Sequence, residues 1–507
     1  MPARIKTASI LGLEAQMIEV EADISAGLPN FFIVGLPDAA IQEAKERIRS
    51  AVKNSQMPFP RTRVTVNLAP AHVRKIGSGF DLPIALAILA ADGQLELRDT
   101  SQLFIGELAL DGSLRPIQGM ISVALLAKEL GIRELIVPRD NAEEAALIHG
   151  LCIRYAHSLT DVQRALLGED TLPEMSHDSA TSNATSHPST LNVDFAAVRG
   201  QEQARRALEI AAAGGHNLLM QGPPGSGKTL LARAFNTILP VMTEQEMLEA
   251  TRIHSVAGLL PPQSVITTRP FRSPHHTSSM TSLVGGGTIP RPGEVSLAHH
   301  GVLFLDELPE FSRPTLECLR QPLEDGYIHI SRAQSCVRYP ARFSLLAAMN
   351  PCPCGYRSDK ERTCTCSPLH YEQYRQRLSG PLLDRIDLYL EVPRVETTAL
   401  TQLPTGETSA EIRIRVQQAR DRQLARFRDV GITTNTQASS EQVSALMNLA
   451  PTAGQLLKQA VQRFRLSARS YFRLLKVSQT IADLEATQAI EIEHVAEALQ
   501  YRSFAPI

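Results

Sequence analysis

The sequence predicts an α/β protein whose middle part is built on a mostly parallel β-sheet. Two observations carry this prediction: short apolar segments alternate with helical ones, and the first of those segments runs into a glycine-rich loop that opens a helix. After about Thr397 the pattern becomes helical, with the apolar spacing of surface helices over Val416–Phe427 and Val495–Tyr501. The strands of the parallel sheet are expected at Asn217–Met220, Val302–Leu305 and Phe343–Ala348.

The chain before this sheet mixes strands and helices. Arg63–Leu68 alternates between polar and apolar residues like a half-buried strand, and Glu134–Pro138 has the pattern of a short buried strand. Helical spacing runs through Ile41–Val52 and through Ile84–Leu95. We therefore expect a separate α/β domain over residues 1–167.

A polar segment follows this domain. Residues 168–195 are rich in Ser, Thr, Asn and Pro, contain five acidic residues and lack Lys and Arg. Such a segment cannot bury enough apolar surface to order itself, which predicts a flexible acidic linker. The remaining chain is expected to form an α/β core over residues 196–396 and a helical domain over residues 397–507.

Composition excludes several classes of protein. The chain has 507 residues, of which 43% are hydrophobic and 21% charged, as in a soluble globular protein. Its 51 Lys and Arg are matched by 53 Asp and Glu, so any nucleic-acid site must be a local patch. The longest apolar stretch, Leu82–Ala91, is too short to span a membrane, and early glutamates such as Glu14 argue against a signal peptide. With only seven Cys, most of them in one cluster, a cytoplasmic protein without membrane partners is expected.

A phosphate-binding loop follows the first strand of the predicted parallel sheet. Its small residues let backbone N–H groups turn toward phosphates at the start of a helix. Lys228 is expected to reach the β- and γ-phosphates, and Thr229 to offer its hydroxyl to Mg²⁺. We therefore predict a site for ATP and Mg²⁺ formed by Gly222, Pro223, Pro224, Gly225, Ser226, Gly227, Lys228 and Thr229.

Further polar residues follow the later strands in a fixed order. Asp306 and Glu307 end the strand Val302–Leu305, where Asp306 would complete the magnesium shell and Glu307 would orient or deprotonate the attacking water. Asn350 lies just past the next strand, where it can hold that water. Arg385 and Arg469 come later in the chain. Taken alone, Asn350 and the two arginines fit solvated or salt-bridged residues, and Arg385 could pair with Asp384 or Asp387; as an ordered set they indicate a catalytic site.

The order of these residues, and the sequence between them, resembles that of the magnesium-chelatase-like AAA+ ATPases, and within them the YifB/ComM group. The resemblance covers essentially the whole chain. It is carried by the segments Phe271–His276, Gly285–Gly287, Gly293–Phe311 and Gly380–Leu388.

The resemblance implies a role for each residue of the set. Asp306 and Glu307 become the Walker B acids, Asn350 sensor 1, Arg385 an arginine finger that acts on a neighbouring subunit, and Arg469 sensor 2. It further implies an AAA+ core with helices on both faces of its parallel sheet, a helical lid and a hexameric ring. The implied function is an ATP-driven motor for DNA branch migration in recombination and natural transformation, with single-stranded and branched DNA and recombination proteins as partners.

The first domain resembles the Lon-protease fold, so a protease has to be considered. When Gly77–Leu86 is matched to the nucleophile segment of Lon-type enzymes, Asp81 stands at the serine position. Ile121 stands at the lysine position, and the nearest downstream lysine, Lys128, is displaced along the chain. Ser78 would need such an amine to become nucleophilic, so no working serine–lysine pair is expected.

The resemblance also implies two hairpin inserts that would touch DNA. The first is expected over Ser282–Ser296, and the second over Gly326–Pro340 with its turn near Ala333–Gln334. Cationic and aromatic residues interleave along the second insert, as on a surface that follows a nucleic-acid backbone, although a solvated hairpin face has the same pattern. The candidate DNA-binding residues are Arg291, Tyr327, Arg332 and Arg338, with Tyr339 interleaved among them.

Four cysteines follow Asn350 closely, in two C-x-C pairs: Cys352, Cys354, Cys364 and Cys366. Four thiolates could hold Zn²⁺ tetrahedrally and stiffen this loop. Four free thiols on a polar loop are the alternative, and the sequence leaves both open.

Two other functions stay open beside the DNA motor. A chelatase-like or protein-remodelling chaperone would need a partner with a metal-binding platform, which this chain does not supply. A regulatory ATP-binding module without turnover is disfavoured by the intact Glu307. The ATPase rate with and without single-stranded DNA discriminates between the motor and the chaperone.

Overall fold

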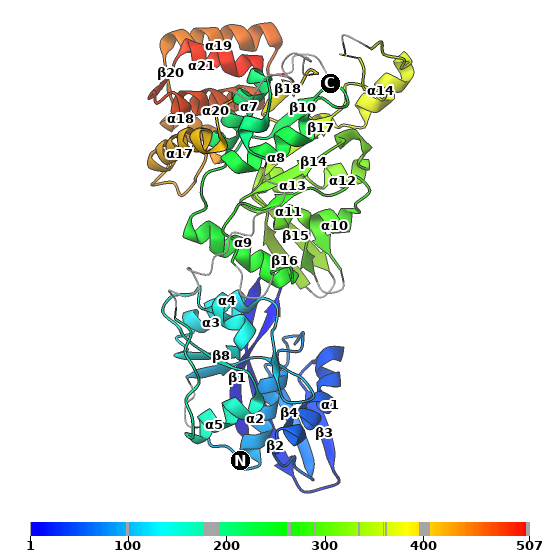
Figure 1. Ribbon diagram of the computed structural model, residues 1–507, viewed down its shortest axis with the longest axis vertical. Coiled ribbons are helices and arrows are strands. Elements are labelled where there is room, and N and C mark those ends of the chain that lie inside the picture. The colour runs from blue at the N-terminus through cyan, green and yellow to red at the C-terminus, as the bar shows by residue number, and fades with distance from the viewer. Residues whose placement is uncertain are drawn as a thin grey trace.

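The computed structural model describes residues 2–97, 101–176, 193–260, 265–287, 290–332, 335–357, 359, 362–394 and 406–502. The molecule is elongated, with the N-terminal part at one end and the parallel-sheet core and the C-terminal helices at the other (Figure 1). The α/β class predicted from the sequence is confirmed, because mixed and parallel sheets are both covered by helices.

The N-terminal part is built on a seven-stranded mixed sheet in the order β3-β4-β2-β1-β5-β8-β9. The strands are β1 (Ala3–Leu11), β2 (Glu14–Ser25), β3 (Asn30–Val34), β4 (Arg63–Ala69), β5 (Gln102–Phe104), β8 (Glu134–Pro138) and β9 (Cys152–Ala156), and β6 (Glu107–Leu108) pairs with β7 (Leu114–Arg115) beside them. The helices of this part are α1 (Ala39–Asn54), α2 (Asp81–Ala91), α3 (Met120–Glu129), α4 (Ala142–Ala145) and α5 (Leu159–Leu167).

Both strands and both helices predicted in this part are present, with one helix shorter than expected. The helix expected over Ile84–Leu95 ends at Ala91 because Asp92 caps it and Gly93 takes a left-handed φ of 77°. The predicted linker begins with packed residues, since Leu172 and Met175 are buried. Residues 177–192 of that linker lie outside the described residues, so its flexibility and its limits stay predictions.

The core contains a five-stranded parallel sheet in the order β11-β14-β17-β10-β18. Its strands are β10 (Leu218–Gln221), β11 (Phe271–Arg272), β14 (Val302–Leu305), β17 (Ser344–Met349) and β18 (Leu388–Glu391). Strands β10, β14 and β17 lie close to the three predicted positions, whereas β11 and β18 were not predicted. All four residues of β14 are buried, as expected for a parallel strand that is covered on both faces. The helices of the core are α7 (Glu202–Gly214), α8 (Lys228–Ile238), α9 (Glu244–Ala257), α10 (Met280–Val284), α11 (Glu294–Leu297), α12 (Arg313–Glu317), α13 (Arg320–Asp325), α14 (Pro368–Gln376) and α15 (Gly380–Leu383).

Both inserts predicted in the core contain antiparallel strand pairs. In the first, β12 (Gly285–Gly286) pairs with β13 (Arg291–Pro292), and in the second, β15 (Tyr327–Arg332) pairs with β16 (Ser335–Pro340). The turn predicted at Ala333–Gln334 lies outside the described residues.

The C-terminal part is helical and packs on the core through α17, which contacts α7 and α8. Its helices are α17 (Ser409–Arg426), α18 (Ser440–Leu446), α19 (Pro451–Phe464), α20 (Ala468–Leu484) and α21 (Ile492–Gln500). One short parallel pair, β19 (Asn448–Leu449) with β20 (Ala489–Ile490), was not expected; apolar periodicity does not reveal a pair of two-residue strands. Within the described ranges, no helix is both long enough and apolar enough to cross a bilayer.

The N-terminal part contacts the core through α3 and α9. The Gly119 N–H group donates to Ser255 Oγ at 2.8 Å, and Arg252 Nε donates to the Leu13 carbonyl at 3.0 Å. Figure 1 shows α9 above α3 and α4, where the N-terminal part meets the core. Helix α9 of the core therefore forms this contact with the N-terminal part, while the rest of the helix faces the core.

Candidate functional site

The phosphate-binding loop lies at the carboxyl edge of the core sheet, between β10 and α8. Gly225 and Gly227 have φ values of 75° and 89°, and a Cβ atom on either would meet no atom within 4 Å. At Gly222, in contrast, a Cβ would lie 2.1 Å from the Val392 carbonyl oxygen. Glycine is therefore required at these positions for backbone conformation and for close packing, which leaves an open concave loop.

Lys228 begins α8 and is buried against the loop. Its Nζ donates to the carbonyl oxygens of Gly222 at 2.8 Å and Pro223 at 3.0 Å, and lies 3.4 Å from Asn350 Oδ1. Burial lowers the pKa of Lys228, and the nearby Asp306 and Glu307 oppose that shift. Among the described residues no carboxylate lies within ion-pair distance of Lys228, so its charge is available to a phosphate.

The two predicted acids meet the loop from the end of β14. Thr229 Oγ1 donates to Asp306 Oδ2 at 2.9 Å, which brings the two predicted magnesium ligands together. The Glu307 N–H group donates to Asp306 Oδ1 at 2.9 Å, and Glu307 takes a left-handed φ of 51°. The loop also holds a buried Ser226 Oγ without a hydrogen-bond partner in the described part of the chain. Oxygen ligands beside an open glycine-rich loop fit a magnesium–nucleotide complex.

The structure adds His276 to this group. Its Nδ1 lies 3.4 Å from Glu307 Oε2, and its ring packs 4.1 Å from the ring of His275. The sequence contained the signal, because His276 ends one of the segments that carry the family resemblance, but no role was assigned to it. His276 is therefore placed to orient the Glu307 carboxylate.

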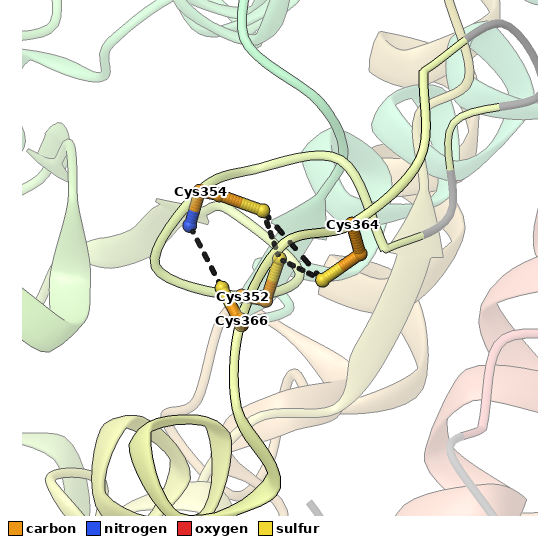
Figure 2. A group of neighbouring side chains, drawn as sticks. All are labelled: Cys352, Cys354, Cys364 and Cys366. Carbon is orange, nitrogen blue, oxygen red and sulfur yellow. Dashed lines mark hydrogen bonds between the residues drawn. The ribbon is translucent and has the colours of Figure 1, made fainter.

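The four cysteines of the predicted zinc site come together directly after Asn350 (Figure 2). Cys352 Sγ lies 3.3 Å from Cys354 Sγ and 3.6 Å from Cys364 Sγ, and the N–H group of Cys354 donates to Cys366 Sγ at 3.3 Å. The backbone N–H group of Tyr356 lowers the pKa of the Cys354 thiol. Four sulfur atoms within 4.8 Å of one another can hold a tetrahedral metal ion.

This cysteine loop packs against the phosphate-binding loop. A Cβ on Gly355, which has a φ of 83°, would lie 2.5 Å from Pro224 Cδ. Residues of the cysteine loop and of the phosphate loop are therefore in direct contact, a relation that the sequence did not indicate.

Arg385 and Arg469 lie elsewhere, at the amino edge of the sheet. The Asn217 side chain, just before β10, donates to the Arg385 carbonyl at 2.9 Å. Arg385 donates a hydrogen bond to one oxygen of the Glu324 carboxylate, and Arg469 donates one to the other oxygen. The alternative in which Arg385 pairs with Asp384 or Asp387 does not occur. Asp387 instead forms an ion pair with Arg473 at 3.3 Å.

The second insert carries one of the expected cation–aromatic pairs. The Arg338 guanidinium lies 3.9 Å from the centre of the Tyr327 ring. Arg291 is exposed on β13, and the side chain of Arg332 lies outside the described residues. Tyr339 does not join this surface: strand alternation turns it into the core, where its hydroxyl donates to the Pro290 carbonyl at 2.8 Å and burial raises its pKa to about 12. Tyr339 thus ties the second insert to the first.

The residues considered for a protease have other partners. Ser78 Oγ donates to Glu107, and Asp81 forms an ion pair with Arg47 at 2.9 Å. Burial raises the pKa of Asp81 to about 6 despite that ion pair. Lys128 lies on α3.

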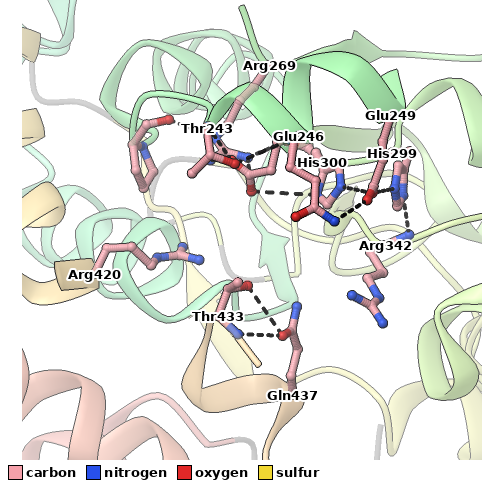
Figure 3. Close-up of polar contacts among 12 residues, drawn as sticks. Thr243, Glu246, Glu249, Arg269, His299, His300, Arg342, Arg420, Thr433 and Gln437 are labelled. Atoms are coloured by element: carbon pink, nitrogen blue, oxygen red, sulfur yellow. Dashed lines mark hydrogen bonds and ion pairs between the residues drawn. The ribbon is translucent and has the colours of Figure 1, made fainter. Parts of the chain in front are cut away.

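A second group of metal-ligating residue types, Glu249, His299 and His300, lies near the amino edge of the sheet (Figure 3). The backbone N–H group of Arg342 donates to His299 Nδ1 at 2.9 Å, and burial lowers the pKa of His299 to about 4. A neutral ring that accepts at Nδ1 must carry its proton on Nε2, which lies 3.2 Å from Glu249. His299 therefore has no free nitrogen for a metal, and this group is a hydrogen-bond network.

Comparisons with known proteins agree with this geometry. Residues 194–400 match the family "Magnesium chelatase, subunit ChlI", residues 20–141 match "Subunit ChlI of Mg-chelatase", and residues 406–502 match its C-terminal family. The chain is 45% identical over 496 residues to the competence protein ComM of Haemophilus influenzae, covering 97% of this chain and 96% of that protein. It is 44% identical over 501 residues to the uncharacterized protein YifB of Escherichia coli, covering 98% and 96% of the two chains. An uncharacterized protein of Mycobacterium tuberculosis is 42% identical over 502 residues, 98% of each chain. The chain therefore belongs to the ComM/YifB family of magnesium-chelatase-like AAA+ proteins.

Proposed function

We propose that this protein is a cytoplasmic ATP hydrolase that works as a hexameric ring and drives the branch migration of DNA. The observation that carries the proposal is the convergence of Lys228, Thr229, Asp306 and Asn350 at one edge of the sheet, with Glu307 beside Asp306. The 45% identity to a protein named for competence supports a role in natural transformation and recombination. Single-stranded and branched DNA, and recombination proteins, are the proposed partners.

Each residue has a distinct task in the proposed hydrolysis. The backbone N–H groups of Gly225–Thr229 and the Lys228 ammonium hold the β- and γ-phosphates. Thr229 and Asp306 would hold Mg²⁺, which supplies positive charge to the phosphate oxygens when bound. Glu307 accepts the proton of the attacking water, and His276 keeps its carboxylate in place. Asn350, beside the Lys228 ammonium, orients the same water.

The position of the two arginines supports the proposal of a ring. Arg385 and Arg469 share Glu324 at the amino edge, whereas the phosphate loop lies at the carboxyl edge. Strand β10 between these edges has four residues, a length of about 13 Å. The arginines of one copy would therefore act on the nucleotide of a neighbouring copy. We propose Arg385 as the arginine finger and Arg469 as sensor 2.

The DNA contacts are proposed at Arg291, Tyr327, Arg332 and Arg338. Arg338 stacks on Tyr327, so the pair offers both a cation and a ring face to a nucleic-acid strand. Because the whole chain has a formal charge of −2, affinity must come from several copies converging on one DNA.

We also propose that Cys352, Cys354, Cys364 and Cys366 hold a structural Zn²⁺. Tetrahedral thiolates at the usual Zn–S distance lie about 3.8 Å apart, close to the separations of 3.3 and 3.6 Å between these sulfur atoms. Elemental analysis of the purified chain should give one zinc per chain, and Cys354→Ser or Cys364→Ser should remove it. Cys152→Ser, at a cysteine on β9, serves as the matched control and should keep it. A metal content that the cluster variants leave unchanged would show four free thiols.

The decisive experiment measures ATP hydrolysis with and without single-stranded DNA. The motor predicts that DNA stimulates the rate, that Glu307→Gln binds ATP without hydrolysing it, and that Arg338→Gln loses most of the stimulation while keeping the basal rate. Arg428→Gln, at an exposed arginine of the C-terminal part, is the charge-matched control and should keep the stimulation. A basal rate that no DNA changes would favour the chelatase-like or protein-remodelling alternative.

A further inference from the structure

A large cavity lies at the amino edge of the core sheet, between the core and the C-terminal helices. Its volume is about 870 Å³, in the range of pockets that hold small ligands. It lies beside the starts of β10, β14, β17 and β18, at the opposite edge from the phosphate loop. Seven cationic side chains line it but only four carboxylates do.

The carboxylates neutralise only some of these cations. Glu246 pairs with Arg269 at 2.9 Å, Asp387 pairs with Arg473 at 3.3 Å, and Glu324 is shared by Arg385 and Arg469. The fourth carboxylate, Asp325, has no ion pair within the described ranges. The remaining cations form a set of three that has no carboxylate partner in the described part of the chain: Arg342, Arg420 and Lys476.

Arg420, on α17, is the most desolvated of the three. Its Nη2 donates to the Ala212 carbonyl at 2.9 Å, while its buried Nε has no hydrogen-bond partner among the described residues. Burial, together with a smaller contribution from the neighbouring Arg269, lowers the pKa of Arg420 to about 9. A buried cation with an unsatisfied N–H group is costly unless an anion approaches it.

Arg342 faces Arg420 from the opposite wall. Its backbone is fixed by the histidine network, because its N–H donates to His299 and its carbonyl accepts from the His300 N–H at 2.7 Å. Its guanidinium forms no hydrogen bond or ion pair with another described residue. Figure 3 shows the Arg342 and Arg420 side chains on either side of an open space, with Thr433 and Gln437 below it.

Lys476, on α20, completes the set. Its Nζ donates to the Thr436 carbonyl at 2.9 Å, and burial lowers its pKa. Two guanidinium groups and one ammonium group thus line a single cavity without an ion-pair partner among the described residues, and Asp325 is the one unpaired carboxylate there. Planar guanidinium forks suit phosphate oxygens, and three positive charges suit an oligophosphate better than a single carboxylate.

We propose that this cavity binds an oligophosphate group through Arg342, Arg420 and Lys476. The phosphates come either from a free small molecule or from the nucleotide held by a second copy of this chain. The inference adds Arg342, Arg420 and Lys476 to the sheet edge where the proposed function places Arg385 and Arg469, and its second source, a neighbour's nucleotide, rests on that proposed function. The histidine network holds the Arg342 backbone in place, although its side chain has no partner among the described residues.

The test uses the full-length Lys228→Ala chain, whose phosphate loop is disabled, and inorganic tripolyphosphate as the probe. Calorimetry is done without Mg²⁺ at a protein concentration where the chain is monomeric. A free ligand as the source predicts one tripolyphosphate per chain, an affinity that falls with salt, and a loss of at least tenfold in Arg420→Gln and in Arg342→Gln. Arg428→Gln, whose side chain is exposed and away from the cavity, should bind as before.

A neighbour's nucleotide as the source predicts a different pattern. The dilute Lys228→Ala chain then does not bind tripolyphosphate. In the chain with an intact loop, Arg420→Gln and Arg342→Gln weaken ATP-dependent self-association at least tenfold without changing the ATP affinity of the single copy. Arg342 is exposed, so Arg342→Gln should fold normally and still tests the proposal if Arg420→Gln fails to fold. If neither variant differs from Arg428→Gln in either assay, the cavity is not a phosphate site, whatever the outcome for the loop at Lys228.

Discussion

The two edges of the core sheet carry complementary charge. At the carboxyl edge, Asp306 and Glu307 stand beside Lys228, which has no carboxylate partner within the described ranges. At the amino edge, cationic side chains outnumber carboxylates around a cavity of about 870 Å³. Under the proposed function, one edge would hold a magnesium–phosphate complex and the other would meet negative charge from a neighbouring copy. The comparison teaches that the residues proposed for the two halves of one phosphate site lie on opposite edges of the sheet in a single copy.

The largest expected effect comes from a substitution that disables the carboxyl edge alone. Lys228→Ala removes the ammonium that lies among the loop carbonyls, so ATP affinity should fall by at least about a hundredfold and hydrolysis should reach background. Fluorescent-nucleotide titration and phosphate release measure the two quantities. Tight ATP binding by this variant would contradict the assignment of the loop.

The next effect comes from the amino edge and tests whether the two edges cooperate between copies. Arg385→Ala should bind ATP normally and lose about 10³- to 10⁵-fold in hydrolysis, as when other arginine fingers are removed. Mixing it with Lys228→Ala creates interfaces that pair an intact loop with an intact arginine, so part of the activity should return. Absence of rescue, with mixed assembly shown by cross-linking, would mean that Arg385 only supports its own subunit through Glu324.

A smaller effect is expected where the cysteine loop meets the phosphate loop. Gly355→Ala forces a side chain into a left-handed backbone and toward Pro224, a strain of about 1–2 kcal/mol. The phosphate loop should shift, so the KM for ATP should rise about tenfold while kcat changes little. Gly454→Ala is the control, because its Cβ would find only ordinary contacts at 3.6 Å from Leu449. An unchanged KM in a chain with unchanged metal content would separate the two loops functionally.

The residues gathered at the carboxyl edge were predictable from the sequence, whereas at the amino edge only Arg385 and Arg469 were, and the cavity beside them was not. Lys228, Asp306 and Asn350 each follow a short apolar strand, and parallel strands bring their carboxyl ends to one edge. Arg342 lies between β16 and β17, Arg420 on α17 and Lys476 on α20, and none of them belongs to a motif. Only the packing of the C-terminal helices on the core brings them around one cavity.

Two smaller differences between the predictions from sequence and the structure also have local causes. The sequence pattern predicts Tyr339 on the DNA surface, but the alternation of β16 turns it inward while Arg338 stays exposed. The contact of His276 with Glu307 joins residues that follow two different strands, β11 and β14, and the sequence gives no measure of their separation. The positions of β10, β14 and β17 were predicted well because buried parallel strands are short apolar runs between polar turns.

The smallest effect concerns Glu324, which holds both amino-edge arginines in one copy. Its two oxygens bond Arg385 and Arg469, and its side chain is 46% exposed. An exposed ion pair contributes about 0–1 kcal/mol. Glu324→Gln should therefore release the arginines and change the protein concentration needed for half-maximal ATPase by up to about fivefold. If Glu324 competes with a neighbour's phosphate for these arginines, the variant should reach half-maximal ATPase at a lower protein concentration, with an unchanged rate per subunit at saturation. Glu317→Gln, which removes the neighbouring exposed pair with Arg320, is the matched control and should leave that concentration unchanged. A Glu324→Gln chain that needs a higher concentration would mean that the carboxylate positions the arginines for the neighbour rather than competing with it.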